Sequence, residues 1–207
     1  DCVSGNEVKR AVECNFPSDK IVFAGVGKSD KEINYSLDKN ILCFNVESIP
    51  ELEVINQLAK NKNQIAPVAL RVNPNVDAYT HHYITTGLEE NKFGINPYQF
   101  DEVLEKLSEL KNLNLIGLHF HIGSQIQDFS VFKKLCQRVN EINKWFTSKH
   151  HHLKIINVGG GLGVDYKNPD LNSVVDFKSY FNIFKEYMEL FPNQQLHFEL
   201  RYLLRQH

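Results

Sequence analysis

The stretch that decides the fold is "INVGGGLGVDY", residues 156–166, where three consecutive glycines directly follow an apolar run. Glycine has no Cβ, so its backbone reaches conformations and close approaches that other residues cannot. At the end of a strand, such a run either lets N–H groups approach an anion or makes a tight turn with close packing between strand and helix. The residues alone leave both interpretations open.

Short apolar runs of strand length recur along the chain and alternate with helical patterns at about 97–110, 128–149 and 174–190. Three further helix starts carry a capping box, a serine followed three residues later by glutamate. This alternating order predicts an α/β fold with a parallel sheet. The expected strands are Ile21–Gly25, Ile41–Val46, Val68–Val72, Ile116–Ile122, Ile155–Val158 and Leu196–Leu200, and the boxes begin at Ser4, Ser29 and Ser48.

The glycine run favours a closed barrel over an open sheet. The dinucleotide pattern G-x-G-x-x-G fails, because the sixth position is Val164 when counted from Gly159 and Tyr166 when counted from Gly161. In (β/α)8 barrels, the loops after strands 7 and 8 commonly hold phosphate. If the last two expected strands are strands 7 and 8, the chain supplies about six of eight βα units. We therefore predict an incomplete TIM-type barrel that forms a single domain over residues 1–207.

Composition restricts the class of partner. The 207 residues are 42% apolar, and 23 basic and 25 acidic residues are spread along the chain, giving a formal net charge of −2. No basic stripe indicates nucleic acid or an anionic membrane, and no apolar run is long enough to span a bilayer. A small-molecule partner is favoured. Four cysteines without a C-x-x-C pair predict buried, reduced thiols in a cytoplasmic protein; they are Cys2, Cys14, Cys43 and Cys136.

Polar residues stand at the expected strand ends, where barrel chemistry gathers. In "GLHFHIGSQI", His119 and His121 lie two apart and share one face of a strand. Three interpretations are open for them: a pair of metal ligands, structural histidines hydrogen-bonded to polar neighbours, or an imidazole that lies beside a flat cofactor. Lys28 is expected to be solvated near a helix start, and the polar segment Val76–Glu90 is expected to be a lid. The other strand-end residues are Asp1, Asn45, Glu47, Arg71, Asn73, Ser124, Glu199 and Arg201.

Five segments together resemble the diaminopimelate decarboxylase family, in order and approximate spacing, over nearly the whole chain. They are "DCVSGNE", "FNVES", "RVNPNVDAYTHHYITTGLEENKFGI", "GLHFHIGSQI" and "NVGGGLGVDY". The resemblance implies an alanine-racemase-like pyridoxal 5'-phosphate enzyme with an N-terminal (β/α)8 barrel and a C-terminal β-domain. It further implies a homodimer that decarboxylates meso-diaminopimelate to L-lysine.

The resemblance also implies roles for individual residues. The three glycines, Gly159, Gly160 and Gly161, would receive the cofactor phosphate, with Ser124 beside it. The cofactor ring would stack on His121. Glu199 would face the pyridine nitrogen of that ring, and Arg71 would face its hydroxyl group. Asp1 would lie near the Schiff-base lysine. Arg201 matches an arginine that contacts phosphate and substrate, although the family places a glycine before it and this chain reads Glu199-Leu200-Arg201.

The family's cofactor lysine precedes the position that Asp1 matches. We therefore expect the lysine-bearing part and the C-terminal domain to lie outside this chain, and the chain alone to be inactive. No residue here is assigned as catalytic, and no metal is expected. Two alternatives remain: an ornithine- or arginine-type decarboxylase, and a catalytically inactive homologue that acts as a binding protein.

Overall fold

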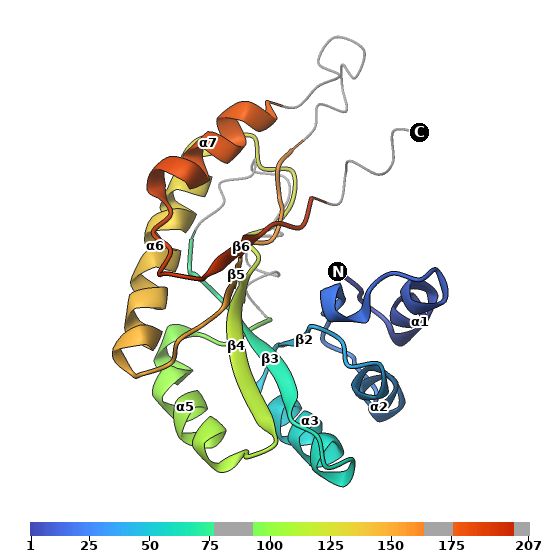
Figure 1. Ribbon diagram of the computed structural model, residues 1–207. Helices are drawn as coiled ribbons and strands as arrows, with labels where there is room; N and C mark the ends of the chain where they lie inside the picture. The colour runs from blue at the N-terminus through green and yellow to red at the C-terminus, as the bar shows by residue number, and fades with distance from the viewer. Residues whose placement is uncertain (77–92, 164–175, 201–207) are drawn as a thin grey trace. The chain divides into compact units, whose positions relative to one another are not determined.

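The computed structural model of this protein describes residues 1–76, 93–163 and 176–200, in which strands alternate with helices (Figure 1). The strands are β1 (Val22–Phe23), β2 (Cys43–Val46), β3 (Ala66–Val72), β4 (Leu113–Phe120), β5 (Ile155–Asn157) and β6 (Gln195–His197). The helices are α1 (Gly5–Glu13), α2 (Asp30–Asp38), α3 (Ile49–Asn61), α5 (Phe100–Glu109), α6 (Phe129–Ser148) and α7 (Phe177–Tyr187), with short 3₁₀ turns at Ser18–Lys20 and Pro97–Gln99.

The sheet keeps its strands in chain order, β1-β2-β3-β4-β5-β6. The pairs β1–β2, β2–β3 and β5–β6 are parallel, with Phe44 opposite Val68 and Ile156 opposite Leu196. An open doubly wound sheet reverses its strand order at one point, whereas the wall of a barrel does not. All six expected strands are present, and their order is that of part of an α/β barrel.

The described chain divides into two compact units. Unit 1 comprises Asp1–Val72 and Phe93–His119, and it holds β1, β2, β3 and most of β4 with α1, α2, α3 and α5. Helix α3 buries Leu52, Ile55 and Ala59, which recur at helical spacing on one face. Strand β2 is buried along its whole length, as expected for a parallel strand covered on both faces.

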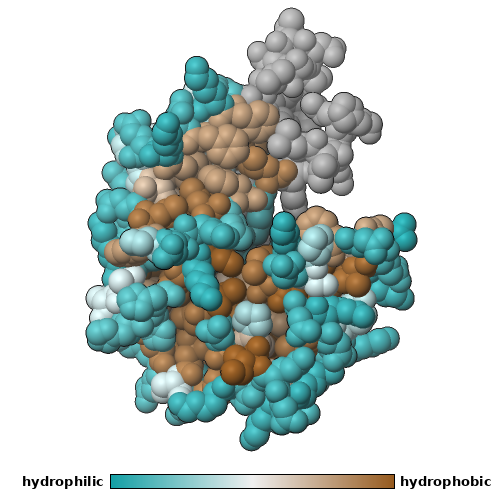
Figure 2. All heavy atoms as spheres, in the orientation of Figure 1, coloured by the Kyte–Doolittle hydropathy of each residue, from teal (hydrophilic) through white to brown (hydrophobic). Residues whose placement is uncertain are grey.

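Unit 2 contains the described residues 73–76, 120–163 and 176–200. Its core joins α6 to α7, where the Phe132 and Tyr180 rings meet edge to face with centroids 4.9 Å apart. Tyr180 is fully buried, and this burial raises the pKa of its hydroxyl. On the surface beside α7, Figure 2 shows apolar side chains; they include Phe181 and Leu190 around a groove that Phe198 also lines.

The three serine–glutamate starts cap their helices, but not all as full capping boxes. At α1 and α3 the Glu7 and Glu51 carboxylates accept the N–H groups of Val3 and Glu47, the residues before the serines, so only the serine half of the expected box forms there. The Ser4 and Ser48 hydroxyls accept the N–H groups of Glu7 and Glu51 at 3.2 and 3.4 Å. At the start of α2, the hydroxyl and the N–H of Ser29 both donate to the Glu32 carboxylate, and these bonds hold the pKa of Glu32 below its usual range. The same carboxylate accepts the Gly5 N–H at 2.7 Å, so this cap also ties α1 to α2.

The expectation that Lys28 is solvated is wrong. Its side chain is only 1% exposed, and its ammonium donates to the carbonyls of Gly25 and Asn45, each at 2.7 Å. The third partner is the Glu51 carboxylate at 2.6 Å. A buried ammonium is tolerated when all its donors are used, and here the three partners come from the end of β1, from β2 and from α3. Lys28 is thus a structural cross-link within unit 1.

Replacing Lys28 with methionine should therefore destabilise the protein strongly. The substitution keeps most of the side-chain volume, but it leaves the Glu51 carboxylate and two carbonyl groups without their donor. We expect a loss of about 3–5 kcal/mol in the free energy of unfolding, measured by chemical denaturation. The exposed pair Lys9–Glu13 provides the control, because Lys9→Met should change that free energy by less than about 0.5 kcal/mol. Equal effects of the two substitutions would contradict the structural role.

Three of the four cysteines are buried and one is not. Cys2, Cys43 and Cys136 lie in the interior, whereas Cys14 at the end of α1 is exposed, which corrects the expectation for that residue. Burial raises the pKa of the Cys136 thiol to about 12. Cys2 adds a parallel bridge to Phe23 beside β1. Over the ranges that the structure describes, none of the helices has the length and apolar character needed to cross a bilayer.

Candidate cofactor site

The glycine run after β5 lies in direct contact with neighbouring backbone. A Cβ at Gly160 would stand 2.0 Å from the Glu199 carbonyl oxygen, and one at Gly159 would stand 2.5 Å from that of Phe120. A Cβ at Gly161 would stand 2.6 Å from the carbonyl oxygen of Gly123. Gly159 and Gly161 also have positive φ angles, +69° and +101°. Close packing therefore applies to all three glycines, but it is packing against the end of β4 and the segments after β4 and β6, and not against a helix as the sequence interpretation had it.

The N–H groups of the run decide whether it can also hold an anion. The Gly159 N–H donates to Asn157 Oδ1 at 2.8 Å, and the Gly159 carbonyl accepts the Glu199 N–H at 2.8 Å. For the N–H groups of Gly160 and Gly161, the structure shows no hydrogen-bond partner among the residues it describes. Two adjacent backbone donors are thus available for an anion, and close packing holds them in place.

Glu199 follows β6 and is held at two points. Its N–H binds the Gly159 carbonyl, and its side-chain Oε1 accepts from Asn157 Nδ2 at 2.9 Å. Asn157 is the last residue of β5 and is only 6% exposed. Asn157 was not among the residues expected at the site. Its one signal in the sequence was a lone amide at the end of an apolar run.

His121 and Ser124 belong to the segment after β4, in the same unit as the glycines. A Cβ at Gly159 would lie 3.3 Å from His121 Nδ1, so the imidazole lies against the start of the glycine run. Ser124 is exposed. His119, inside β4, is buried. Among the described residues, no three His, Cys, Asp or Glu side chains gather as a metal site would require.

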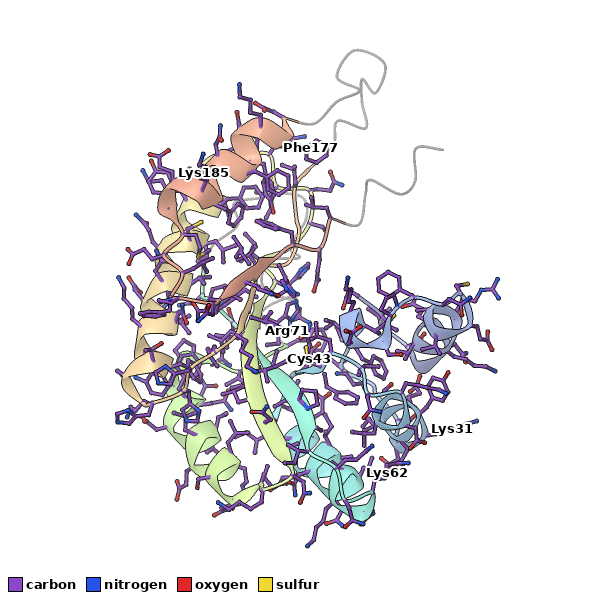
Figure 3. The ribbon with its side chains drawn as sticks, in the orientation of Figure 1. Lys31, Cys43, Lys62, Arg71, Phe177 and Lys185 are labelled. Atoms are coloured by element: carbon purple, nitrogen blue, oxygen red, sulfur yellow. The ribbon has the colours of Figure 1, made fainter. Side chains whose placement is uncertain are left out.

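Two further expected residues belong to unit 1. Arg71 of β3 donates through Nη1 to both carboxylate oxygens of Glu47, each at 2.9 Å. The Glu47 side chain is 4% exposed and that of Arg71 15%, so the pair is largely shielded from water and fixes the direction of the guanidinium. Figure 3 labels Arg71 on β3 and Cys43 on the neighbouring β2. Asp1 is exposed and precedes the Cys2 bridge.

Two expectations fall outside the described residues. Arg201 lies beyond residue 200, and the expected lid Val76–Glu90 is described only at Val76. The structure therefore tests neither of them.

Comparison with known proteins identifies the family of this chain. Residues 1–200 match the model of the pyridoxal-binding domain of the pyridoxal-dependent decarboxylases. The chain belongs to this family. Pyridoxal phosphate is thus the cofactor of the domain, and the available N–H pair and the nearby carboxylate fit its phosphate and its ring nitrogen.

Individual relatives confirm the resemblance to diaminopimelate decarboxylases that the sequence motifs indicated. The chain is 58% identical over 200 residues to diaminopimelate decarboxylase of Bacteroides thetaiotaomicron, covering 97% of this chain and 52% of that protein. It is 43% identical over 170 residues to the Aquifex aeolicus enzyme of that name, covering 82% and 40%. The chain therefore spans about half the length of the curated relatives it matches.

Solved structures confirm the barrel fold. A point mutant of diaminopimelate decarboxylase from Helicobacter pylori, complexed with L-lysine, aligns with a TM-score of 0.86 at 36% identity, over 97% of this chain and 50% of that one. An arginine decarboxylase from Paramecium bursaria Chlorella virus aligns with a TM-score of 0.73 at 22% identity, which supports the shared fold alone. The prediction of an incomplete TIM-type barrel is confirmed.

The packing of the glycine run predicts that a single methyl group disrupts it. Gly160→Ala places a Cβ against the Glu199 carbonyl, so we expect a loss of about 2–4 kcal/mol in the free energy of unfolding. Gly27→Ala is the matched control, because a Cβ there meets no atom within 4 Å and its φ is not positive. Chemical denaturation of both variants measures the difference. A Gly160→Ala protein as stable as the control would show that the close contact is not needed.

Proposed function

We propose that the complete protein carrying this chain is a pyridoxal-phosphate-dependent decarboxylase that converts meso-2,6-diaminopimelate to L-lysine, in lysine biosynthesis. The observation that carries this proposal is the 58% identity to a diaminopimelate decarboxylase over nearly the whole chain. The related structure that contains L-lysine, the product of this reaction, supports it.

The residues of unit 2 would hold two parts of the cofactor. The N–H groups of Gly160 and Gly161 would donate to the phosphate, where a charge-assisted bond contributes roughly 1.5–3 kcal/mol. The Gly159 N–H is engaged by Asn157, so Gly159 would serve through its conformation. Ser124 would add a hydroxyl donor to the phosphate, and the His121 imidazole would lie against the ring.

The Glu199 carboxylate would accept a hydrogen bond from the protonated pyridine nitrogen. When bound, pyridoxal phosphate supplies a ring that accepts the electron pair left as carbon dioxide departs. A carboxylate beside the ring nitrogen favours the protonated form of that nitrogen, because opposite charges at short distance stabilise each other. In unit 1, the Glu47–Arg71 pair would present a fixed guanidinium to the ring hydroxyl. Asp1 would stand near the cofactor lysine.

Several further features are part of the proposal. Arg201 would contact substrate and phosphate, and residues 1–207 would form a single cofactor-binding barrel domain. The complete protein would be a cytoplasmic homodimer that binds neither nucleic acid nor membranes. The identity to curated diaminopimelate decarboxylases favours this substrate over ornithine or arginine, because the similarity to an arginine decarboxylase is at the level of fold.

Carbon dioxide release by the complete protein tests this function. Supplied separately with meso-diaminopimelate, ornithine, arginine and lysine, the protein should decarboxylate diaminopimelate, and the other three at a rate lower by about 100-fold or more. Glu199→Gln should lower the rate with diaminopimelate by about 100-fold or more, because an amide does not supply the negative charge. Preferential turnover of ornithine or arginine would overturn the substrate. Binding of pyridoxal phosphate without any turnover would favour the inactive homologue.

A further inference from the structure

Asn157 connects two parts of the candidate cofactor site. Its side-chain oxygen accepts the Gly159 N–H at 2.8 Å, and its side-chain nitrogen donates to Glu199 Oε1 at 2.9 Å. One amide thus links the first glycine of the run to the carboxylate at the end of the neighbouring strand. These three residues all belong to unit 2.

The orientation of this amide follows from its surroundings. A backbone N–H can only donate, so the Asn157 atom that faces Gly159 must be the oxygen. The NH₂ group consequently faces Glu199, and the Glu199 oxygen that it meets must accept. A hydrogen bond donated to a carboxylate stabilises its ionised form. Asn157 is only 6% exposed, and hydrogen bonds are electrostatically stronger in such an interior than in water.

Glu199 is also fixed through its backbone. Its N–H donates to the Gly159 carbonyl at 2.8 Å, and its own carbonyl lies where a Cβ of Gly160 would stand. The backbone therefore sets the position of the residue. The bond from Asn157 holds one oxygen of its carboxylate, Oε1, at 2.9 Å from the amide nitrogen.

From this arrangement we infer that Asn157 is a positioning residue, which keeps Glu199 ionised and aimed while it holds Gly159 in the conformation that leaves the next two N–H groups available. The inference rests on the proposed function. Asn157 acts on the cofactor only through Glu199 and Gly159. Its loss should lower the protonation of the ring nitrogen and also weaken phosphate binding.

The test uses the complete protein, pyridoxal phosphate labelled with ¹⁵N in its ring, and the variants Asn157→Ala and Asn157→Ser. Titration measures cofactor affinity, and the ¹⁵N resonance reports protonation of the ring nitrogen. We expect Asn157→Ala to raise the dissociation constant about 10-fold and to move the resonance toward that of the unprotonated ring. Asn157→Ser, whose side chain is shorter than that of asparagine, should change both quantities by at most as much as Asn157→Ala does.

Asn140 provides a matched control in the same unit. It is 7% exposed and also uses both ends of its amide, donating to the Tyr187 carbonyl and accepting the Glu189 N–H at 2.8 and 2.9 Å. Neither bond involves the glycine run or Glu199. Asn140→Ala should lower the melting temperature about as much as Asn157→Ala, but it should leave the dissociation constant within about 2-fold and the ¹⁵N resonance unchanged.

A double substitution separates an action through Glu199 from a direct one. In a Glu199→Gln protein, adding Asn157→Ala should cause no further change in the ¹⁵N resonance, because its effect passes through the missing carboxylate. Folded Asn157 variants with unchanged affinity and resonance would overturn the inference and leave the proposed function intact. Loss of the fold in both variants would show a purely structural role and would also overturn it. An unsubstituted protein that binds no pyridoxal phosphate would instead refute the proposed function.

Discussion

Backbone contact between the glycine run and the neighbouring strand ends is the constraint on which the candidate site depends. Gly159, Gly160 and Gly161 each lie so close to a carbonyl group that a Cβ has no room. This contact sets the position of Glu199, whose backbone pairs with Gly159. It also leaves two N–H groups of the run without a partner among the described residues. One local geometry thus combines close packing with two backbone donors that are unpaired within the described ranges.

This geometry shows close packing of the glycine run and leaves its use as a phosphate site as a proposal. A turn that needs bare backbone and a cradle for phosphate are compatible. The close contacts fill the positions that Cβ atoms would take, whereas the donors for an anion would be the backbone N–H groups of Gly160 and Gly161. The Gly159 N–H is the exception, since Asn157 occupies it. A substitution in the run consequently tests stability first, and binding must be tested through the residues around it.

The sequence contained most of the fold. Each of the six expected strands is present, because apolar runs of strand length and serine–glutamate helix starts are local signals. Strand ends were less accurate: β6 spans Gln195–His197, whereas Leu196–Leu200 was expected, and the hydrogen bond from the Glu199 N–H to the Gly159 carbonyl lies beyond the strand end. Such a contact between residues 40 positions apart leaves no mark in local periodicity.

The side chains whose roles sequence reasoning missed each have at least one partner distant in the chain. Lys28 was expected in solvent, yet it bonds the Asn45 carbonyl and the Glu51 carboxylate from elements further along the chain. Asn157 lies inside the motif "NVGGGLGVDY", but nothing in that motif indicated its hydrogen bond to Glu199, 42 residues later. Family resemblance singled out His121, Ser124, Arg71 and the glycines as candidates, because these belong to continuous motifs.

The most direct test of this account is the behaviour of the glycine amides when the cofactor binds. In the complete protein with ¹⁵N-labelled glycine, the account predicts that pyridoxal phosphate shifts the Gly160 and Gly161 amide resonances strongly and Gly159 little, because Asn157 already holds that N–H. Pyridoxal without the phosphate should leave Gly160 and Gly161 nearly unchanged. Unaltered Gly160 and Gly161 resonances in the presence of bound pyridoxal phosphate would contradict the assignment of the run as the phosphate site.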